Sequence, residues 1–356
     1  MSYKILAINP GSTSTKITVY EDEELIFTKS ISHSAQEVEQ FESINAQKDY
    51  RLNLILDVLK ENDIDIQTLD AVCGRGGLLK PLPSGGTYEV NDKMVVDLTE
   101  AKQGEHASNL GGLLARSIAD SIGKKAYTVD PTVIDELIDV ARYSGLKELP
   151  RVSKFHALNQ KAIARKYAKD TGRKYEDVNV VVAHMGGGIS IGTHRKGKVI
   201  DVNNALDGDG PFTPNRTGTL PTGDLVKLCY SGKYSFEDMY RRIVVNGGLI
   251  SYSGSNDFRT IAKRAEDGES EMAELIEAFI YDAAKHIAMM CAPLKGEIDA
   301  ILLTGGIAYS EQVTGGIAAY VSNIAPLKAY PGENEMLALT EGVLRVLRGE
   351  EEAKVY

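Results

Sequence analysis

Residues 8–16 are small and polar, with a lysine at the end of the run. They read Ile-Asn-Pro-Gly-Ser-Thr-Ser-Thr-Lys, between segments that alternate apolar and polar residues with period two. A Walker-type loop places its second glycine directly before Lys-Ser/Thr and leads into a helix, whereas Thr15 precedes Lys16 here and a strand pattern follows. We therefore predict a hairpin turn whose amides near Gly11, hydroxyls and lysine ammonium could hold a phosphate. An ordinary Gly- and Ser-rich turn is the alternative.

Two further glycine motifs follow later in the chain. "AHMGGGIS" contains Gly186, Gly187 and Gly188, and three consecutive glycines beside strand ends suit a turn that a ligand approaches closely. "LLTGGIAYSE" places Gly305 and Gly306 at the end of a buried strand and before a helix, where nucleotides commonly bind in open α/β sheets. One such motif is a weak signal, but three in this order indicate a nucleotide site.

Two arginines stand where an anion clamp is expected. Arg75 ends a predicted strand and is followed by Gly76 and Gly77, and Arg216 lies in a long loop rich in Gly, Pro and Thr. A planar guanidinium matches carboxylate and phosphoryl oxygens. A surface ion pair is the alternative for each arginine.

Histidines and carboxylates complete the set of candidate groups. His106 and His156 each precede a predicted helix, and His184 adjoins the second glycine motif, although each could be structural. Asp130 ends a predicted strand before a proline and could either cap a helix or orient a nucleophile. Glu335 could favour a helix N-terminus or supply the carboxylate that Mg²⁺ needs.

The elements that must position these groups occur in two similar sets. Three strands joined by hairpins open the chain, and strands at 178–184, 189–195 and 198–203 repeat the arrangement around the second glycine turn. We therefore predict an internally duplicated α/β fold of two βββαβαβα halves, the plan of the actin-like ATPase and kinase superfamily. Its active-site cleft would lie between the halves, with phosphates between the two turns.

The chain is long enough for two domains. We expect a first domain of residues 1–130 and 337–356, closed by a returning amphipathic helix, and a second domain of residues 131–336. The net charge of −10 argues against nucleic-acid and membrane partners. The three cysteines have no metal-ligand spacing, so we expect them to be buried in a reducing, cytoplasmic protein.

Several motifs together resemble the acetate kinase family. "INPGSTSTK", "AHMGGGIS", "SNDFR" and "LLTGGI" match it in order, over nearly the whole chain. The ending "PGENEMLALTEGVLRVLRGE" and "GRGG" look most like the members that act on butyrate and branched-chain acids. The resemblance implies reversible, Mg²⁺- and ATP-dependent transfer of the γ-phosphoryl group to butyrate, isobutyrate or a similar acid, which yields an acyl phosphate and ADP. We also expect a homo-oligomer, a dimer or a multiple of dimers.

The resemblance also implies roles for individual residues. For phosphate binding they are Asn9, Ser12, Ser14 and Lys16 in the first domain, with His184, Gly186, Gly187 and Gly188 in the nucleotide-binding second domain. Around the adenosine they are Asp257, Phe258, Arg259, Gly305, Gly306 and Ile307. In catalysis they are Arg75 for the substrate carboxylate, Arg216 for the transferring phosphoryl group, His156 for the transition state, His106 and the essential Asp130. Asn9 and Glu335 match the residues near Mg²⁺.

The chemistry suits these groups, because a carboxylic acid with a pKa of about 4 to 5 is already ionised at neutral pH and needs no base. A sugar or amino-sugar kinase needs a carboxylate to accept a hydroxyl proton, and Asp130 keeps that alternative open. A chaperone-like or actin-like ATPase is the second alternative. Where acetate kinases have branched side chains after the carboxylate arginine, this chain has Gly76 and Gly77. We expect that loss of bulk to leave room for a longer acyl chain.

Overall fold

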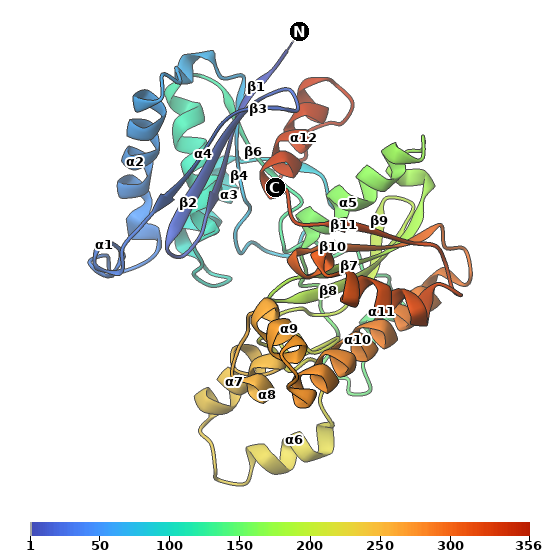
Figure 1. Ribbon diagram of the computed structural model, residues 1–356. Helices are drawn as coiled ribbons and strands as arrows, with labels where there is room; N and C mark the ends of the chain where they lie inside the picture. Colours follow the sequence, from blue (N-terminus) through green and yellow to red (C-terminus); the bar gives the residue numbers. More distant parts are fainter. Residues whose placement is uncertain (1) are drawn as a thin grey trace. The chain divides into compact units, whose positions relative to one another are not determined.

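The computed structural model describes residues 2–356 as two compact units (Figure 1). Unit 1 combines the chain up to Ile134 with Asn334–Tyr356, and unit 2 is Asp135–Glu333. Residues 131–134 and 334–336 belong to unit 1, whereas the limits expected from the sequence put them in the second domain. Glu335 is therefore a residue of unit 1.

A mixed sheet of six strands forms the centre of unit 1, in the order β3-β2-β1-β4-β6-β5. The strands are β1 (Lys4–Pro10), β2 (Ser14–Glu21), β3 (Glu24–Ser32), β4 (Ala71–Gly74), β5 (Thr87–Glu89) and β6 (Lys125–Val129). The helices are α1 (Ala35–Glu39), α2 (Lys48–Glu61), α3 (Asp92–Glu100), α4 (Asn109–Ser121) and α12 (Glu335–Leu347). Strand β1 pairs antiparallel with β2 and parallel with β4.

Unit 2 has a five-stranded sheet in the order β11-β10-β7-β8-β9. The strands are β7 (Asn179–Met185), β8 (Ile189–Arg195), β9 (Lys198–Val202), β10 (Ala300–Gly305) and β11 (Leu327–Pro331). The helices are α5 (Ala157–Asp170), α6 (Thr222–Cys229), α7 (Phe236–Val244), α8 (Leu249–Ser253), α9 (Phe258–Glu266), α10 (Ser270–Cys291) and α11 (Glu311–Val321). Strand β7 pairs antiparallel with β8 and parallel with β10.

The two sheets confirm the predicted duplication. Each sheet contains an antiparallel meander of three strands. The first strand of the meander, β1 or β7, also pairs in parallel with a later strand, β4 or β10. Parallel pairing needs a long crossover, which α2 supplies before β4 and which α6 to α10 supply before β10. The short strands β5 and β11 have too few residues to show the period-two alternation from which a strand is predicted.

Every residue of β7 is buried, because helices cover both of its faces. Val180 and Val182 belong to a core cluster with α5, whereas Val181 and Ala183 belong to a second cluster with α10. The rigid strand therefore ends in a well-defined position at Met185, immediately before the second glycine motif.

Helix α12 returns to unit 1 and packs on β1, β4 and β6, where Figure 1 shows it in red beside the blue strands. The approach is close, since a Cβ atom added to Gly342 would lie 2.4 Å from the Val129 side chain. Buried Met336, Leu339 and Val343 line the packed face. This packing fixes the start of α12 at the edge of the sheet.

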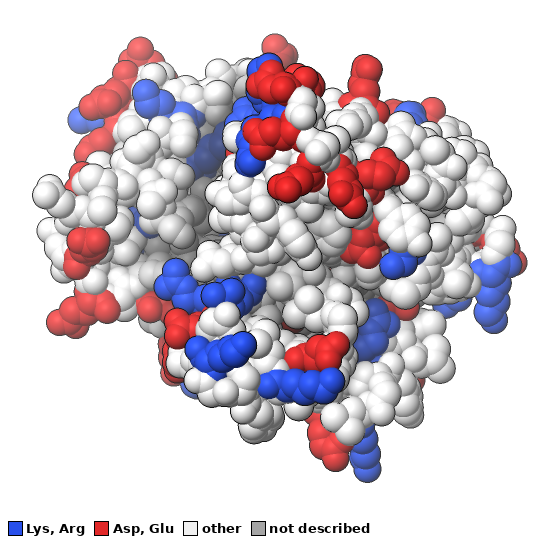
Figure 2. Space-filling view, turned by 60° about the horizontal axis from the view of Figure 1, so that its bottom comes forward, with Lys and Arg blue, Asp and Glu red and all other residues white. Residues whose placement is uncertain are grey.

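The surface carries both signs of charge, which are interspersed on the face shown in Figure 2. Cys73 and Cys291 are buried, as expected, but Cys229 at the end of α6 is exposed, so the expectation is wrong for this residue. Within residues 2–356, none of the helices combines the length and apolar character that crossing a bilayer would require.

Candidate active-site groups

The first glycine motif is a β-hairpin turn, as predicted. The Gly11 amide donates to the Ser14 carbonyl at 2.7 Å, and the strands on either side pair in antiparallel register. The Ser12 side chain is exposed. Lys16 lies opposite Asn9 in the ladder, so both side chains project from the same face of the sheet. The turn and its flanking strands therefore present the Ser12 hydroxyl, the Lys16 ammonium and the Asn9 side-chain amide.

Arg51 of α2 donates hydrogen bonds to the backbone of this turn. This role was not among the predictions made from the sequence. Its guanidinium, in a residue only 1% exposed, donates to the carbonyls of Gly11 and Ser12 at 2.8 and 3.1 Å. Gln47 Oε1 accepts from two other N–H groups of the same guanidinium, and burial lowers the pKa of Arg51. Its position four residues before buried Ile55, on the apolar face of the helix, is the sequence signal for an interior arginine.

Replacing Arg51 with methionine should destabilise the protein by about 3 kcal/mol, because the half-buried carbonyls of the turn and the buried Thr15 and Gln47 side chains would lose a charged donor. Urea unfolding of the purified variant measures the loss. Arg348→Met is the matched control, since its partners Asp22 and Glu23 are on the surface and exposed pairs contribute under about 1 kcal/mol. Equal losses in the two variants would contradict the role given to Arg51.

Arg75, Glu335 and Asn9 form a cluster in unit 1. The Arg75 guanidinium binds the Glu335 carboxylate in bidentate fashion, with both N–O distances 2.9 Å. Asn9 Nδ2 donates to Glu335 Oε2 at 2.8 Å. The residues come from the end of β1, the residue after β4 and the first turn of α12. The Arg75 and Glu335 side chains are 30% and 16% exposed, so a ligand can reach them.

The two glycines after Arg75 are tightly packed. A Cβ atom on Gly76 would lie 2.5 Å from Pro131 Cβ, and one on Gly77 would lie 2.5 Å from Asn109 Cα. The expectation that these glycines leave room for a longer acyl chain is therefore wrong. Their missing side chains allow the chain to approach β6 and α4, and the neighbouring backbone fills the space.

Gly77→Val should consequently destabilise unit 1 by about 3 kcal/mol, the upper part of the usual range for overpacked cores. Gly315→Ala is the control, because a Cβ atom there meets nothing within 4 Å and the residue lies inside α11. That control should gain up to about 1 kcal/mol from helix propensity. Urea unfolding tests both. A Gly77→Val protein of wild-type stability would instead show open space beside the glycine.

His106 and Asp130 also lie in unit 1. His106 Nδ1 accepts from the Ser108 amide at 3.2 Å, and burial together with the nearby Arg75 charge lowers the pKa of His106, which favours the neutral ring. The Asp130 residue is buried at a φ of 40°, and its carboxylate accepts from the Gly86 amide at 2.7 Å. No helix starts beside Asp130 within residues 2–356, so the capping alternative is wrong.

The second glycine motif turns between β7 and β8 in unit 2. The Gly186 amide donates to the Gly188 carbonyl at 3.1 Å, and Gly187 at the tip is exposed with open space beside it. A Cβ atom on Gly188 would lie 1.9 Å from Arg216 Nη1. A Cβ atom on Gly305, which has a φ of 88°, would lie 2.4 Å from the Met185 carbonyl oxygen. The second and third glycine motifs therefore meet at the ends of β7 and β10.

Arg216 lies against the second turn with part of its guanidinium unsatisfied. Nη1 donates to the Ala205 carbonyl at 2.9 Å, but Nε is buried without a hydrogen-bond partner. Burial lowers the pKa of Arg216, and it forms no ion pair among residues 2–356. The surface ion pair considered from the sequence is therefore wrong for this arginine. An anion at the turn would satisfy the orphaned donor.

Two histidines that are distant in the sequence stack at the same turn. The His156 and His184 rings lie 3.9 Å apart, with 17° between their planes. His184 Nδ1 is 2.9 Å from Asn159 Oδ1, and His184 Nε2 is 3.4 Å from Glu333 Oε1. His156 is the residue before α5, as the sequence predicted. Unit 2 thus brings Arg216, His156 and the glycine turn together.

The residues matched to the adenosine site differ in their exposure. Phe258 lies in the core against Phe279, with ring centroids 5.7 Å apart, and Ile307 is also in the core. Asp257 caps α9 and pairs with the exposed Arg259. Gly306 follows β10 in open space. Their assignment to the adenosine stays a prediction.

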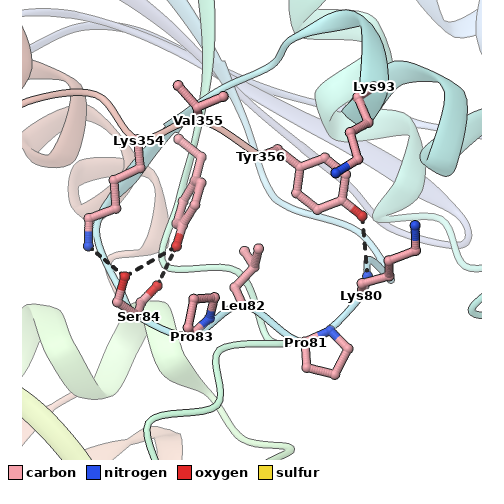
Figure 3. A pocket seen from close by; sticks show the side chains of 10 residues that line it. Lys80, Pro81, Leu82, Pro83, Ser84, Lys93, Lys354, Val355 and Tyr356 are labelled. Atoms are coloured by element: carbon pink, nitrogen blue, oxygen red, sulfur yellow. Dashed lines mark hydrogen bonds between the residues drawn. The ribbon is translucent and has the colours of Figure 1, made fainter.

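A pocket of about 350 Å³ in unit 1 is lined by none of these candidate residues (Figure 3). Its wall includes Lys80, Leu82, Lys93 and the chain end from Lys354 to Tyr356. Tyr356 donates to Asp97 at 2.7 Å, and burial with this bond raises the pKa of Tyr356 to about 12. Because its polar groups bind one another, we interpret this pocket as the docking place of the last residues.

The chain is similar to known proteins in sequence and in fold. Residues 142–321 match the sequence model of a family described as the Acetokinase family. A probable butyrate kinase of Clostridium botulinum (strain Alaska E43 / Type E3) is 54% identical over 356 residues, the whole of both chains. Butyrate kinase 1 of Clostridium acetobutylicum is 55% identical over 354 residues, 99% of each chain.

Solved structures show the same fold. The crystal structure of Porphyromonas gingivalis acetate kinase matches with a TM-score of 0.82 at 17% identity, over 97% of this chain and 100% of that chain. The predicted two-domain α/β fold of the acetate and sugar kinases is thereby confirmed.

Proposed function

Because the chain belongs to the acetokinase family, we propose that it is a butyrate kinase, which transfers the γ-phosphoryl group of ATP to butyrate and forms butyryl phosphate and ADP reversibly. The observation that carries the proposal is the match along the whole chain to relatives named butyrate kinase. The family resemblance expected from the sequence is confirmed by the same match.

In unit 1, we assign Arg75 to the substrate carboxylate. The guanidinium already holds one carboxylate, that of Glu335, in the bidentate geometry that a butyrate would adopt. Butyrate is ionised at neutral pH, so the carboxylate oxygen can attack phosphorus without a base. The reaction needs the two anions to be brought together and their charges neutralised.

In unit 2, we assign Arg216 and His156 to the transferring phosphoryl group. The unpartnered Nε of Arg216 and the amides of the glycine turn are donors for its oxygens. Within unit 1, phosphate oxygens would be bound by Asn9, Ser12, Ser14 and Lys16. Within unit 2, Gly187 would have this role. The family implies ATP as the phosphoryl donor.

Mg²⁺ fits the residues of the cluster in unit 1. Glu335 offers carboxylate oxygens and Asn9 an amide oxygen, which are hard ligands of the kind that Mg²⁺ prefers. Mg²⁺ commonly keeps several waters and binds through one or two carboxylates together with substrate phosphates, so a single carboxylate can suffice on the protein side. Bound there, Mg²⁺ would neutralise phosphate charge.

The environment of Asp130 weighs against the sugar-kinase alternative. Its carboxylate is buried and accepts from the Gly86 amide, whereas a base for a sugar hydroxyl must face the substrate. A chaperone-like ATPase would hydrolyse ATP without any small carboxylate. Neither alternative explains why Arg75 binds a carboxylate and why Arg216 has a buried Nε without a hydrogen-bond partner.

A hydroxamate assay tests the proposed function. Purified protein is incubated with ATP, Mg²⁺ and hydroxylamine, together with acids from formate to branched valerates. We expect the largest hydroxamate yield with butyrate or isobutyrate, and none without ATP. Hexoses and amino sugars, assayed by ADP release, should give no turnover. A protein that phosphorylates a sugar, or hydrolyses ATP equally without an acid, would contradict the proposal.

A further inference from the structure

A buried chain of hydrogen bonds runs from His156 into the interior of unit 2. His156 Nδ1 lies 2.8 Å from Ser190 Oγ, to which Gln160 Nε2 donates at 2.7 Å. Gln160 Oε1 lies 3.0 Å from His194 Nε2, and His194 Nδ1 lies 2.7 Å from the Tyr175 hydroxyl. Ser190, Gln160 and His194 are 0% exposed. We call Ser190, Gln160, His194 and Tyr175 the buried relay.

The orientation of Gln160 fixes the direction of this relay. Gln160 Nε2 also donates to the Ser190 backbone carbonyl at 3.0 Å, and a carbonyl can only accept, so the amide nitrogen must face Ser190. The amide oxygen then faces His194, whose Nε2 must carry a hydrogen and donate it. Gly192 makes the arrangement possible, since a Cβ atom there would lie 2.2 Å from Gln160 Oε1.

The Ser190 hydroxyl selects the tautomer of His156. Its oxygen accepts from Gln160, and its own hydrogen has His156 Nδ1 as its acceptor among the hydrogen bonds of residues 2–356. If Nδ1 carried a proton, the hydroxyl hydrogen would be buried without a partner, which is unfavourable. Nδ1 therefore accepts, and the proton of the neutral ring is on Nε2.

The Cε1 edge of this imidazole borders the second glycine turn. A Cβ atom on Gly188 would lie 3.5 Å from His156 Cε1, the carbon between the two ring nitrogens, and 1.9 Å from Arg216 Nη1. We propose that the buried relay is a positioning device that holds His156 as the neutral Nε2–H tautomer, the form that can donate to a phosphoryl oxygen. The identity of that acceptor rests on the proposed function.

Ser190→Ala tests the relay through kinetics. It should lower kcat about 100-fold, as small misplacements of reacting groups do, and leave the KM values for ATP and butyrate unchanged. Ser190→Thr, which keeps the hydroxyl, should recover most of the activity. The control is Thr193→Val, which removes an equally buried hydroxyl from β8 that donates to the Met290 carbonyl instead. Equal kcat values in Ser190→Ala and Thr193→Val would overturn the proposal.

The tautomer of His156 can be measured without substrate by long-range ¹H–¹⁵N NMR spectra of protein labelled with ¹⁵N-histidine. The signals of His156 are those that disappear in the His156→Gln variant. The wild type should show His156 protonated at Nε2 alone, and Ser190→Ala should lose that single tautomer. Protonation at Nδ1 in the wild type would overturn the proposal even if the variants fail to fold. The NMR result does not depend on the proposed function. If the hydroxamate assay fails but His156 is protonated at Nε2, the butyrate kinase proposal is rejected and the proposal of the buried relay stands.

Discussion

Arg216→Ala is expected to lower kcat by at least about 1000-fold, the size of effect known for arginines that stabilise a transferring phosphoryl group. The physical reason is the orphaned Nε, a buried guanidinium donor for which a ligand anion would be a partner, although the Asp207 carboxylate already acts on the charge of Arg216. The KM for butyrate should change little, because the interaction strengthens as charge develops in the transition state. Steady-state kinetics with varied butyrate measures both constants.

Two variants control this experiment. Arg216→Lys keeps the charge but loses the planar fork, so we expect it to recover little activity. Arg264→Ala removes a guanidinium of unit 2 that is already paired with Glu269, and kcat should stay at the wild-type value. An Arg216→Ala enzyme with wild-type kcat would remove Arg216 from the mechanism.

Arg75→Ala is expected to raise the KM for butyrate roughly 100-fold, because two charge-assisted hydrogen bonds of about 1.5 kcal/mol or more would be lost. Arg75→Lys should recover only part of the affinity, since a lysine cannot form the bidentate pair. The KM for ATP measured in parallel shows whether the effect is confined to the acid.

Arg116→Ala is the matched control for unit 1, because this arginine, paired with Asp92 and Asp120, is not part of the cluster of Arg75, Glu335 and Asn9. Its KM for butyrate should equal that of the wild type. If Arg75→Ala raises the KM for ATP and leaves the KM for butyrate unaltered, Arg75 serves the nucleotide and our assignment is wrong.

Features that depend on local pattern could be predicted from the sequence. Period-two alternation around Gly11 and around Gly187 indicated two hairpins, and both are present. The repeated order of strands and glycine turns indicated the duplication, which the two sheets share. These predictions succeed because the side-chain period of a strand and the backbone needs of a turn are local properties.

Features that depend on tertiary packing could not be predicted. Asn9 and Glu335 meet across 326 positions of sequence, and Arg51 reaches the first turn from a separate helix. Gly76 and Gly77 show a further limit. The absence of a side chain indicates either open space or close contact, and only the position of Asn109 and Pro131 shows that it is contact.

The central claim is that a carboxylate oxygen of the acid attacks the γ-phosphorus of ATP. The most direct test uses butyrate labelled with ¹⁸O at both carboxyl oxygens. After reaction with ATP and cleavage of the acyl phosphate by hydroxylamine, mass spectrometry of the products should find one ¹⁸O in inorganic phosphate and one in the hydroxamate. Phosphate without ¹⁸O, or label transferred to AMP, would contradict the account.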